Sequence, residues 1–188
     1  MIKRGTLEFR TVGTGENRAK VVLLPGHEFP IEHFFPPNQT HVLHYSRRVR
    51  LVQSNLPPQP KFYAKRSVTP IDYDTWTIAA QARLAKYVNG LRIEGVNIEE
   101  PLATVFRKPG IVETMYREIQ AASFFKRLWL TGEQRHLYDH FIETLKREGI
   151  EPFDHSVGVD EKGIIHVIDL EDWGVKPELA KKLGLKKQ

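Results

Sequence analysis

The most informative part of the chain is residues 149–172, which read GIEPFDHSVGVDEKGIIHVIDLED. A glycine that ends a helix opens this stretch, and an acidic loop follows. Two short apolar strands, at 157–159 and 164–168, then flank the polar turn 160–163. Asp169 comes directly after the second strand. Taken by itself, an aspartate in this position is a turn residue or a helix cap.

Outside this hairpin, strands are predicted mainly in the first part of the chain and helices mainly in the second. Apolar and turn patterns predict strands at 6–12, 19–24, 41–45, 49–53, 62–67, 102–106 and 111–116. Helical spacing predicts helices at 71–88, 121–130 and 131–148, and a short one beginning at Pro177. Residues 26–40 are expected to form a loop with buried phenylalanines. This order predicts an α+β fold with a strand-rich first lobe and a helix-rich second lobe.

The composition excludes several classes of protein. Of the 188 residues, 40% are hydrophobic and 27% are charged, which is typical of a globular protein. The chain contains no cysteine, so disulfides, thiolate catalysis and cysteine-ligated metal centres are excluded. No apolar run approaches the roughly 20 residues of a membrane span, and the first residues lack the apolar core of a signal peptide. We therefore expect a cytoplasmic protein without a membrane span.

Charge is distributed unevenly along this basic chain, whose formal net charge is +5. Between Glu32 and Asp72 there is no acidic residue, and the basic residues there are Arg47, Arg48, Arg50, Lys61, Lys65 and Arg66. Residues 148–172 instead contain eight acidic residues and one lysine. The basic part could bind polyphosphate or nucleic acid, and the acidic part could hold hard cations. Both could equally be solvated surfaces.

Residues 149–172 resemble the catalytic and metal-binding loops of the protein-kinase-like superfamily. The resemblance is greatest to small atypical members: aminoglycoside phosphotransferases, RIO kinases and lipopolysaccharide kinases. In those proteins an apolar strand ends in an aspartate that holds magnesium against the phosphates of ATP, and Asp169 matches that position. Lys65 matches the family lysine that grips the α- and β-phosphates, and it follows Val49 by 16 residues.

The resemblance spans about residues 41–174 and implies a two-lobed, protein-kinase-like fold. Residues 1–40 would add an N-terminal strand pair and an aromatic loop. Residues 41–118 would be like the N-lobe, and residues 119–188 would form a reduced helical C-lobe. In this arrangement Lys65 and Asp169 would lie near each other in a cleft between the lobes.

The resemblance also implies roles for residues around Lys65 and Asp169. Glu151 stands at the family position of the catalytic base, and Asp154 is the alternative if the loop is shorter. Ser156 stands where the family has a metal-binding asparagine. Arg47 and Arg48 stand where a glycine-rich loop is expected, and they could clamp phosphates in its place.

Departures from the family pattern leave two forms of kinase-like function open. Residues 46–48 contain no glycine, no acidic residue lies between Thr75 and Asn89 to orient the lysine, and Ser156 replaces an amide. The chain is therefore interpreted as an ATP- and magnesium-dependent phosphotransferase acting on a protein or small-molecule acceptor, or as a catalytically degenerate kinase-like regulator.

An alternative from another class is a basic nucleic-acid-binding regulatory protein. Aromatic residues near the basic ones would then be stacking platforms for bases. The residues of this reading are Tyr45, Phe62 and Tyr63 with Arg47, Arg48, Arg50, Lys61 and Lys65. A separate and weaker metal signal is the i, i+4 pair of His136 and His140, which lacks an evident third ligand.

Overall fold

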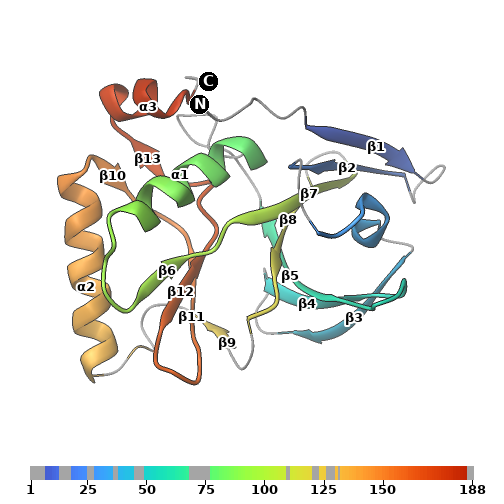
Figure 1. The fold of residues 1–188 in the computed structure, drawn as a ribbon, viewed down its shortest axis with the longest axis horizontal. Helices are drawn as coiled ribbons and strands as arrows, with labels where there is room; N and C mark the ends of the chain where they lie inside the picture. The colour runs from blue at the N-terminus through green and yellow to red at the C-terminus, as the bar shows by residue number, and fades with distance from the viewer. Residues whose placement is uncertain are drawn as a thin grey trace. The chain divides into compact units, whose positions relative to one another are not determined.

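The structure is a computed structural model of the 188-residue chain. It describes residues 7–12, 18–24, 28–35, 38–44, 49–67, 77–108, 111–119, 123–125, 130 and 132–185. In that part of the chain the fold is mixed α+β, with a curled antiparallel sheet and three α-helices, which confirms the predicted class (Figure 1). The chain divides into two compact units, residues 1–68 with 101–118 and residues 69–100 with 119–188.

The first unit is built on a seven-stranded sheet with the strand order β1-β2-β7-β8-β5-β4-β3. The strands are β1 (Glu8–Val12), β2 (Ala19–Leu23), β3 (Gln39–His44), β4 (Val49–Ser54), β5 (Lys61–Ser67), β7 (Pro101–Lys108) and β8 (Ile111–Arg117). Every neighbouring pair is antiparallel. All of these strands lie where the sequence patterns predicted strands.

One face of this sheet carries the apolar core of the first unit, and the 3-10 helix η2 (Ile31–Phe34) packs against it. The period-two alternation of β5 turns Phe62 and Ala64 toward this core. The ring centroids of Phe34 and Phe62 are 4.9 Å apart, and Phe34 is completely buried. Phe34 and Phe35 are buried as predicted, whereas Phe29 is half-buried and the predicted loop contains the 3-10 helix η2.

The second unit contains a four-stranded sheet of order β6-β12-β11-β9, together with helices. Its helices are α1 (Ile78–Gly90), α2 (Gly132–Arg147) and α3 (Pro177–Leu183), and its strands are β6 (Val96–Ile98), β9 (Ser123–Phe125), β11 (Ser156–Val159) and β12 (Ile165–Ile168). A separate two-residue pair joins β10 (Ile150–Glu151) to β13 (Gly174–Val175). The predicted hairpin of β11 and β12 and the predicted helix over 131–148 are confirmed.

Local capping explains where the helices of the second unit begin and end. Thr77 precedes α1 and its side chain accepts a hydrogen bond from the Ala80 N–H at 3.2 Å, as an N-cap residue does. Pro177 opens α3, and Gly184 ends it in a left-handed conformation with φ of 68°. None of the helices in the described part of the chain is long and apolar enough to cross a membrane.

The structure corrects some of the predicted elements. The predicted helix at 121–130 is wrong for residues 123–125, which form β9, because they pair with β11 from Val157 to Val159. This segment is a short apolar run, whose periodicity does not distinguish helix from strand. The first part of the helix predicted at 71–88, residues 71–76, lies outside the described residues, and α1 continues to Gly90.

Candidate functional site

The candidate site in the first unit centres on Lys65, which is only 2% exposed. Lys65 lies on β5 directly opposite Val49 of β4 and Thr114 of β8, and residues that pair across strands share a face of the sheet. Thr114 in turn lies opposite Thr104 of β7. The four side chains form a row across the sheet, called here the Lys65 row, on the face opposite to the apolar core.

The Lys65 row is polar although it is buried. Thr104 and Thr114 are 2% and 1% exposed, and within the described residues neither hydroxyl oxygen has a hydrogen-bond partner. Each hydroxyl can donate one hydrogen bond and accept others. Tyr63 and Tyr116 flank the row on the same face and are equally buried. This side of the sheet therefore offers hydrogen-bonding groups next to a lysine.

The opposite face of the same sheet holds a buried ion cluster. Glu113 is completely buried and accepts a hydrogen bond from the Arg50 guanidinium, and the Nε of Arg66 lies 3.9 Å from the same carboxylate. Burial, and after it the charge of Arg66, lowers the pKa of Arg50. Because Glu113 lies opposite Arg66 and not Lys65 in the register, its carboxylate belongs to the other face.

The basic residues predicted to bind phosphate or nucleic acid differ in their surroundings. Arg47 and Arg48 lie outside the described residues, so their role as phosphate clamps stays a prediction. Arg50 is held by Glu113, and Lys61 lies 3.9 Å from the carboxylate of Glu118. Arg50 and Lys61 therefore each lie beside a carboxylate of their own unit.

The candidate site in the second unit centres on Asp169. Every residue of β12 is buried, and Asp169 follows it with 1% exposure and a backbone φ of 81°. Aspartate is one of the few residues that tolerate the left-handed region, and non-glycine residues held there often mark functional sites. The strand thus delivers a buried carboxylate at a sharp change of backbone direction, where the sequence predicted a turn residue or a metal ligand.

Ser156 is brought to the same end of the β11–β12 hairpin. It lies opposite Ile168 in the antiparallel register, so it is adjacent to the residue before Asp169. Glu171, two residues after Asp169, is also buried at 4% exposure. The hydroxyl and carboxylate that the sequence assigned to a metal ion therefore lie at the same end of one hairpin.

The two predicted catalytic bases lie in the loop that leads into this hairpin. Glu151 is on β10 opposite Gly174, and its side chain is exposed. Asp154 is also exposed, three residues further on. Phe153 between them is 60% exposed. Both carboxylates are accessible to an acceptor molecule from solvent.

His155 is held in place by aromatic side chains. Its Nε2 contacts the hydroxyl of Tyr138 on α2, and its ring meets that of Trp173 edge to face at 5.7 Å. Trp173 is 1% exposed and also contacts Phe141 of α2 at 6.4 Å. This cluster ties α2, the loop with Glu151 and Asp154, and the segment after Asp169 to one another.

A buried histidine, His166, was not identified from the sequence. Its Nδ1 lies 2.7 Å from Glu99 and its Nε2 lies 3.0 Å from Asp160. Burial lowers the pKa of His166, but the hydrogen bonds to the two carboxylates outweigh it, so that the pKa is raised above 6.5. The contact between His166 and Glu99 could not be predicted, because it depends on the parallel pairing of β6 with β12. β6 is only three residues long, and no sequence pattern predicts its partner.

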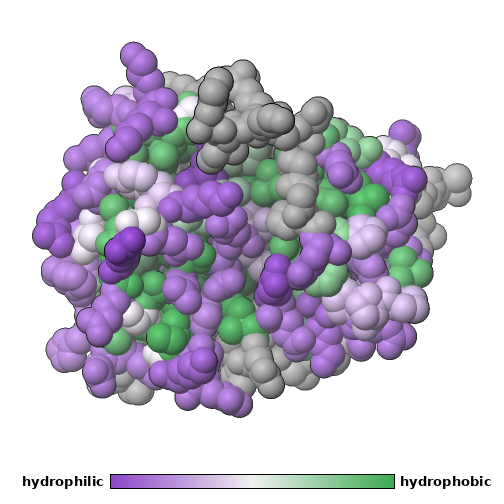
Figure 2. Space-filling view, viewed as in Figure 1, coloured by the Kyte–Doolittle hydropathy of each residue, from purple (hydrophilic) through white to green (hydrophobic). Residues whose placement is uncertain are grey.

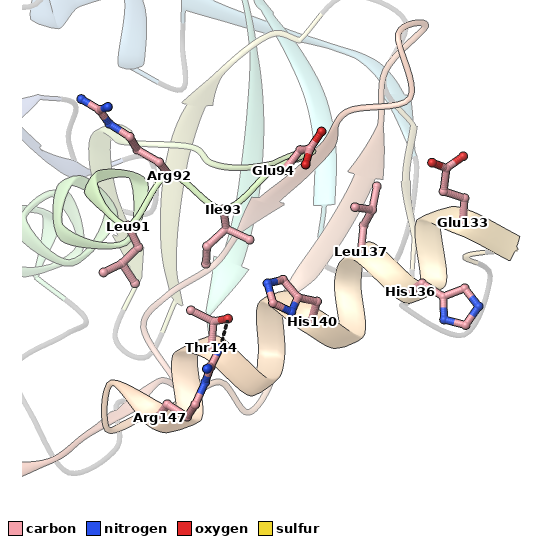
Figure 3. Close-up of a pocket in the computed structure, with 10 residues that line it drawn as sticks. All are labelled: Leu91, Arg92, Ile93, Glu94, Glu133, His136, Leu137, His140, Thr144 and Arg147. Atoms are coloured by element: carbon pink, nitrogen blue, oxygen red, sulfur yellow. Dashed lines mark hydrogen bonds between the residues drawn. The ribbon is translucent and has the colours of Figure 1, made fainter.

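The predicted histidine pair borders a surface groove of about 510 Å³ between α2 and the α1–β6 loop. Figure 3 shows the rings of His136 and His140 pointing in different directions, with His140 beneath Ile93. Apolar side chains emerge between hydrophilic ones over this part of the molecule (Figure 2). In the described residues no group of three or more histidine, aspartate or glutamate side chains is arranged to hold a metal ion.

Comparisons with known proteins found no match to this chain. No protein-family model matches it. No match was found among curated proteins or among solved structures. The predicted proximity of Lys65 and Asp169 joins the two units and stays a prediction.

Proposed function

We propose that the chain is a small kinase-like protein that binds ATP with magnesium and transfers the γ-phosphoryl group to a protein or small-molecule acceptor. One observation carries the proposal. Lys65 and Asp169, the residues that the family resemblance assigns to phosphate and metal, are 2% and 1% exposed. Lysine and aspartate are rarely buried to this degree, and almost never unless their charge is compensated.

The support in the first unit is the chemistry of the Lys65 row. An ammonium group binds phosphate oxygens by charge-assisted hydrogen bonds, which are stronger than neutral ones. The hydroxyls of Thr104 and Thr114 can donate to or accept from the polar groups of a nucleotide. Val49 adds an apolar contact beside the lysine. A phosphate-bearing ligand with an apolar part fits this combination of side chains.

The support in the second unit is the oxygen donor set at the end of β12. The carboxylate of Asp169 and the hydroxyl of Ser156 are hard oxygen ligands of the type that magnesium prefers. When bound, the ion would neutralise charge on the β- and γ-phosphates. Ser156 keeps an oxygen where the family has an amide, so the donor set fits magnesium with a neutral second ligand.

The acceptor would be oriented by the loop before the hairpin. Glu151 or Asp154 would accept the proton of an acceptor hydroxyl, and both carboxylates are exposed to solvent. Phosphoryl transfer needs mainly positioning and charge stabilisation, so this small set of residues is chemically sufficient. The contacts of His155 with Tyr138 and Trp173 hold this loop next to α2.

A thermal-shift measurement with ATP and magnesium tests binding, and transfer of labelled γ-phosphate to the chain itself or to added proteins tests catalysis. At a hundredfold excess over the dissociation constant a ligand stabilises by about 2.7 kcal/mol, which raises the melting temperature by about 5–10 °C. Adenosine should shift it less because it lacks the phosphates that Lys65 would hold.

Binding without transfer would identify the catalytically degenerate form of the same protein. No shift with ATP and magnesium would contradict the proposal. In that case the nucleic-acid reading is tested by polynucleotide binding, which should weaken steeply with salt. No described observation favours that reading, because Arg50 is paired with Glu113 and residues 47 and 48 lie outside the described part of the chain.

A further inference from the structure

We infer that β1 is a pairing surface for a second copy of this chain, which adds its own β1 antiparallel to the edge of the seven-stranded sheet. The inference is independent of nucleotide binding. β1 is the outermost strand in the sheet order, and among the described residues it pairs with β2 alone (Figure 1). The other side of its backbone presents N–H and C=O groups that can pair with another strand.

The side chains of β1 leave this edge accessible. Those of residues 8–11 are all exposed, and Phe9 is 58% exposed, which is unusual for a large hydrophobic side chain in this molecule. Natural edge strands are commonly protected by charged side chains, by proline or by a bulge. β1 contains no proline, and its register with β2 runs without a shift. Its two charged side chains, Glu8 and Arg10, are opposite in sign, so they do not repel a second copy that pairs each with the other.

The sequence of β1 is complementary to itself. When two antiparallel copies are centred on Phe9, Glu8 of each copy lies opposite Arg10 of the other. Opposite charges facing each other across antiparallel strands stabilise the pair, and like charges destabilise it. The two Phe9 rings form an aromatic cross-strand pair at the centre. Both copies use the same surface, as a two-fold symmetric dimer requires.

Space for the side chains of the second copy lies beside β1. Glu8 and Arg10 lie opposite Leu23 and Val21, on the side of the strand that faces the apolar core. A groove of about 510 Å³ adjoins this side, and its border is Glu8, Phe9, Arg10, Pro30, Ile31 and Glu32. Glu32 forms an ion pair with Arg10 of its own chain. Arg10 would therefore lie between Glu32 and Glu8 of the second copy.

Sedimentation velocity of the full chain over a range of concentrations tests the inference. A pair of five-residue strands buries less than the roughly 1,000 Å² typical of stable complexes, so we expect a dimer that dissociates on dilution. The average mass of the unmodified protein should rise toward twice the monomer mass with concentration. A monomer at every concentration up to the millimolar range overturns the inference.

Charge reversal then tests the register. Glu8→Arg turns each charge pair into two facing arginines, and Arg10→Glu turns each into two facing glutamates, so each variant alone should be monomeric. The Glu8→Arg variant carries arginine at both positions, and the Arg10→Glu variant carries glutamate at both. In an equimolar mixture, two unlike chains centred on Phe9 therefore place each arginine opposite a glutamate. The mixture therefore restores two opposite-charge pairs and should dimerise.

The mixture is also a control for misfolding, because two variants that fail to fold would not form a dimer when they are mixed. Glu32→Gln removes the ion pair within the chain and should leave the dimer intact. Glu133→Arg, the same charge change at an exposed position of α2, is the matched control and should not alter the mass.

Two further outcomes would contradict the proposed dimer. Dimers that persist in both single variants would show a different interface and overturn the inference. A mixture that stays monomeric, with both variants folded by circular dichroism, overturns the register centred on Phe9.

Discussion

Lys65 lies directly opposite Val49 across β4 and β5, and both side chains are buried on one face of the sheet. The same face carries Thr114 on the other side of Lys65. The lysine is thus flanked by an apolar side chain on one strand and a hydroxyl on the next. Its surroundings differ from those of a surface lysine, which keeps its charged end in water.

Replacing Lys65 by Met should weaken ATP binding at least tenfold, because the variant keeps the length of the side chain and loses the charge that holds phosphate. Adenosine, which has no phosphate, should bind both proteins equally. Isothermal titration calorimetry measures both affinities. Lys61→Met on the same strand is the control, since Lys61 is half-buried near Glu118. Equal loss of ATP and adenosine binding would indicate a damaged fold instead of a phosphate contact.

Replacing Glu113 by Gln should lower the free energy of unfolding by about 3–5 kcal/mol, because it leaves Arg50 partly buried without its counter-charge. Urea denaturation measures the loss. The matched control is Glu118→Gln, which removes an exposed pair with Lys61 and should cost less than about 1 kcal/mol. Similar losses in the two variants would contradict the energetic role given to the buried cluster.

The stability of the second unit should depend on pH through His166. The hydrogen bonds to Glu99 and Asp160 hold the pKa of His166 above its ordinary value of 6.5 although burial opposes them. A raised folded-state pKa stabilises fully below the unfolded value and loses this contribution as the pH rises through the folded value. Stability should therefore fall on the alkaline side of pH 6.5.

The acid limit of the same cluster comes from Asp160. Burial raises the pKa of Asp160, but hydrogen bonds from His166, Ile164 and Lys162 outweigh it and lower the pKa below 3.8. This contribution is present above that pH and is lost as the pH falls through the lowered value. Urea denaturation across pH should show the alkaline loss in the unmodified protein and not in His166→Gln. An exposed control, His136→Gln, should retain it, and identical pH profiles for all three proteins would refute the assignment.

Replacing Tyr138 by Phe should loosen the loop that carries Glu151 and Asp154, because it removes the hydroxyl that contacts His155. A typical hydrogen bond of this kind contributes about 1 kcal/mol, or more if its partner is left buried and unpaired. Amide hydrogen exchange at Ser156 and Val157 should quicken by about fivefold or more. Exchange in the middle of α2 serves as the internal control. Unchanged exchange at Ser156 would mean that the aromatic cluster does not hold the loop.

Local patterns predicted much of the fold because the responsible interactions are close in sequence. The β11–β12 hairpin is closed by a polar turn in which Asp160 accepts hydrogen bonds from the N–H groups of Lys162 and Ile164, both at 2.9 Å. The helix α2 follows from apolar residues spaced by about one turn. Asp169 was identified as a candidate because it ends an apolar strand. In each case the pattern that predicts the feature lies within a short segment of the chain.

The features that were not predicted depend on pairing between distant segments. Glu99 meets His166 because β6 joins β12 in parallel, and the two residues are far apart in the chain. Thr104 and Thr114 become a buried polar row with Lys65 through the register of β7, β8 and β5. Ser123–Phe125 becomes a strand because β11 offers it an edge. Local propensity carries no information on such partners.

Asp169 is proposed to bind the magnesium ion that accompanies ATP. The ATP affinity of the unmodified protein and of Asp169→Asn, each measured with and without magnesium, tests this role. Magnesium should tighten ATP binding at least tenfold in the unmodified protein, and Asp169→Asn, which keeps the shape and removes the charge, should lose this gain while remaining folded. The same gain in both proteins, or no ATP binding by the unmodified one, would overturn the assignment of Asp169.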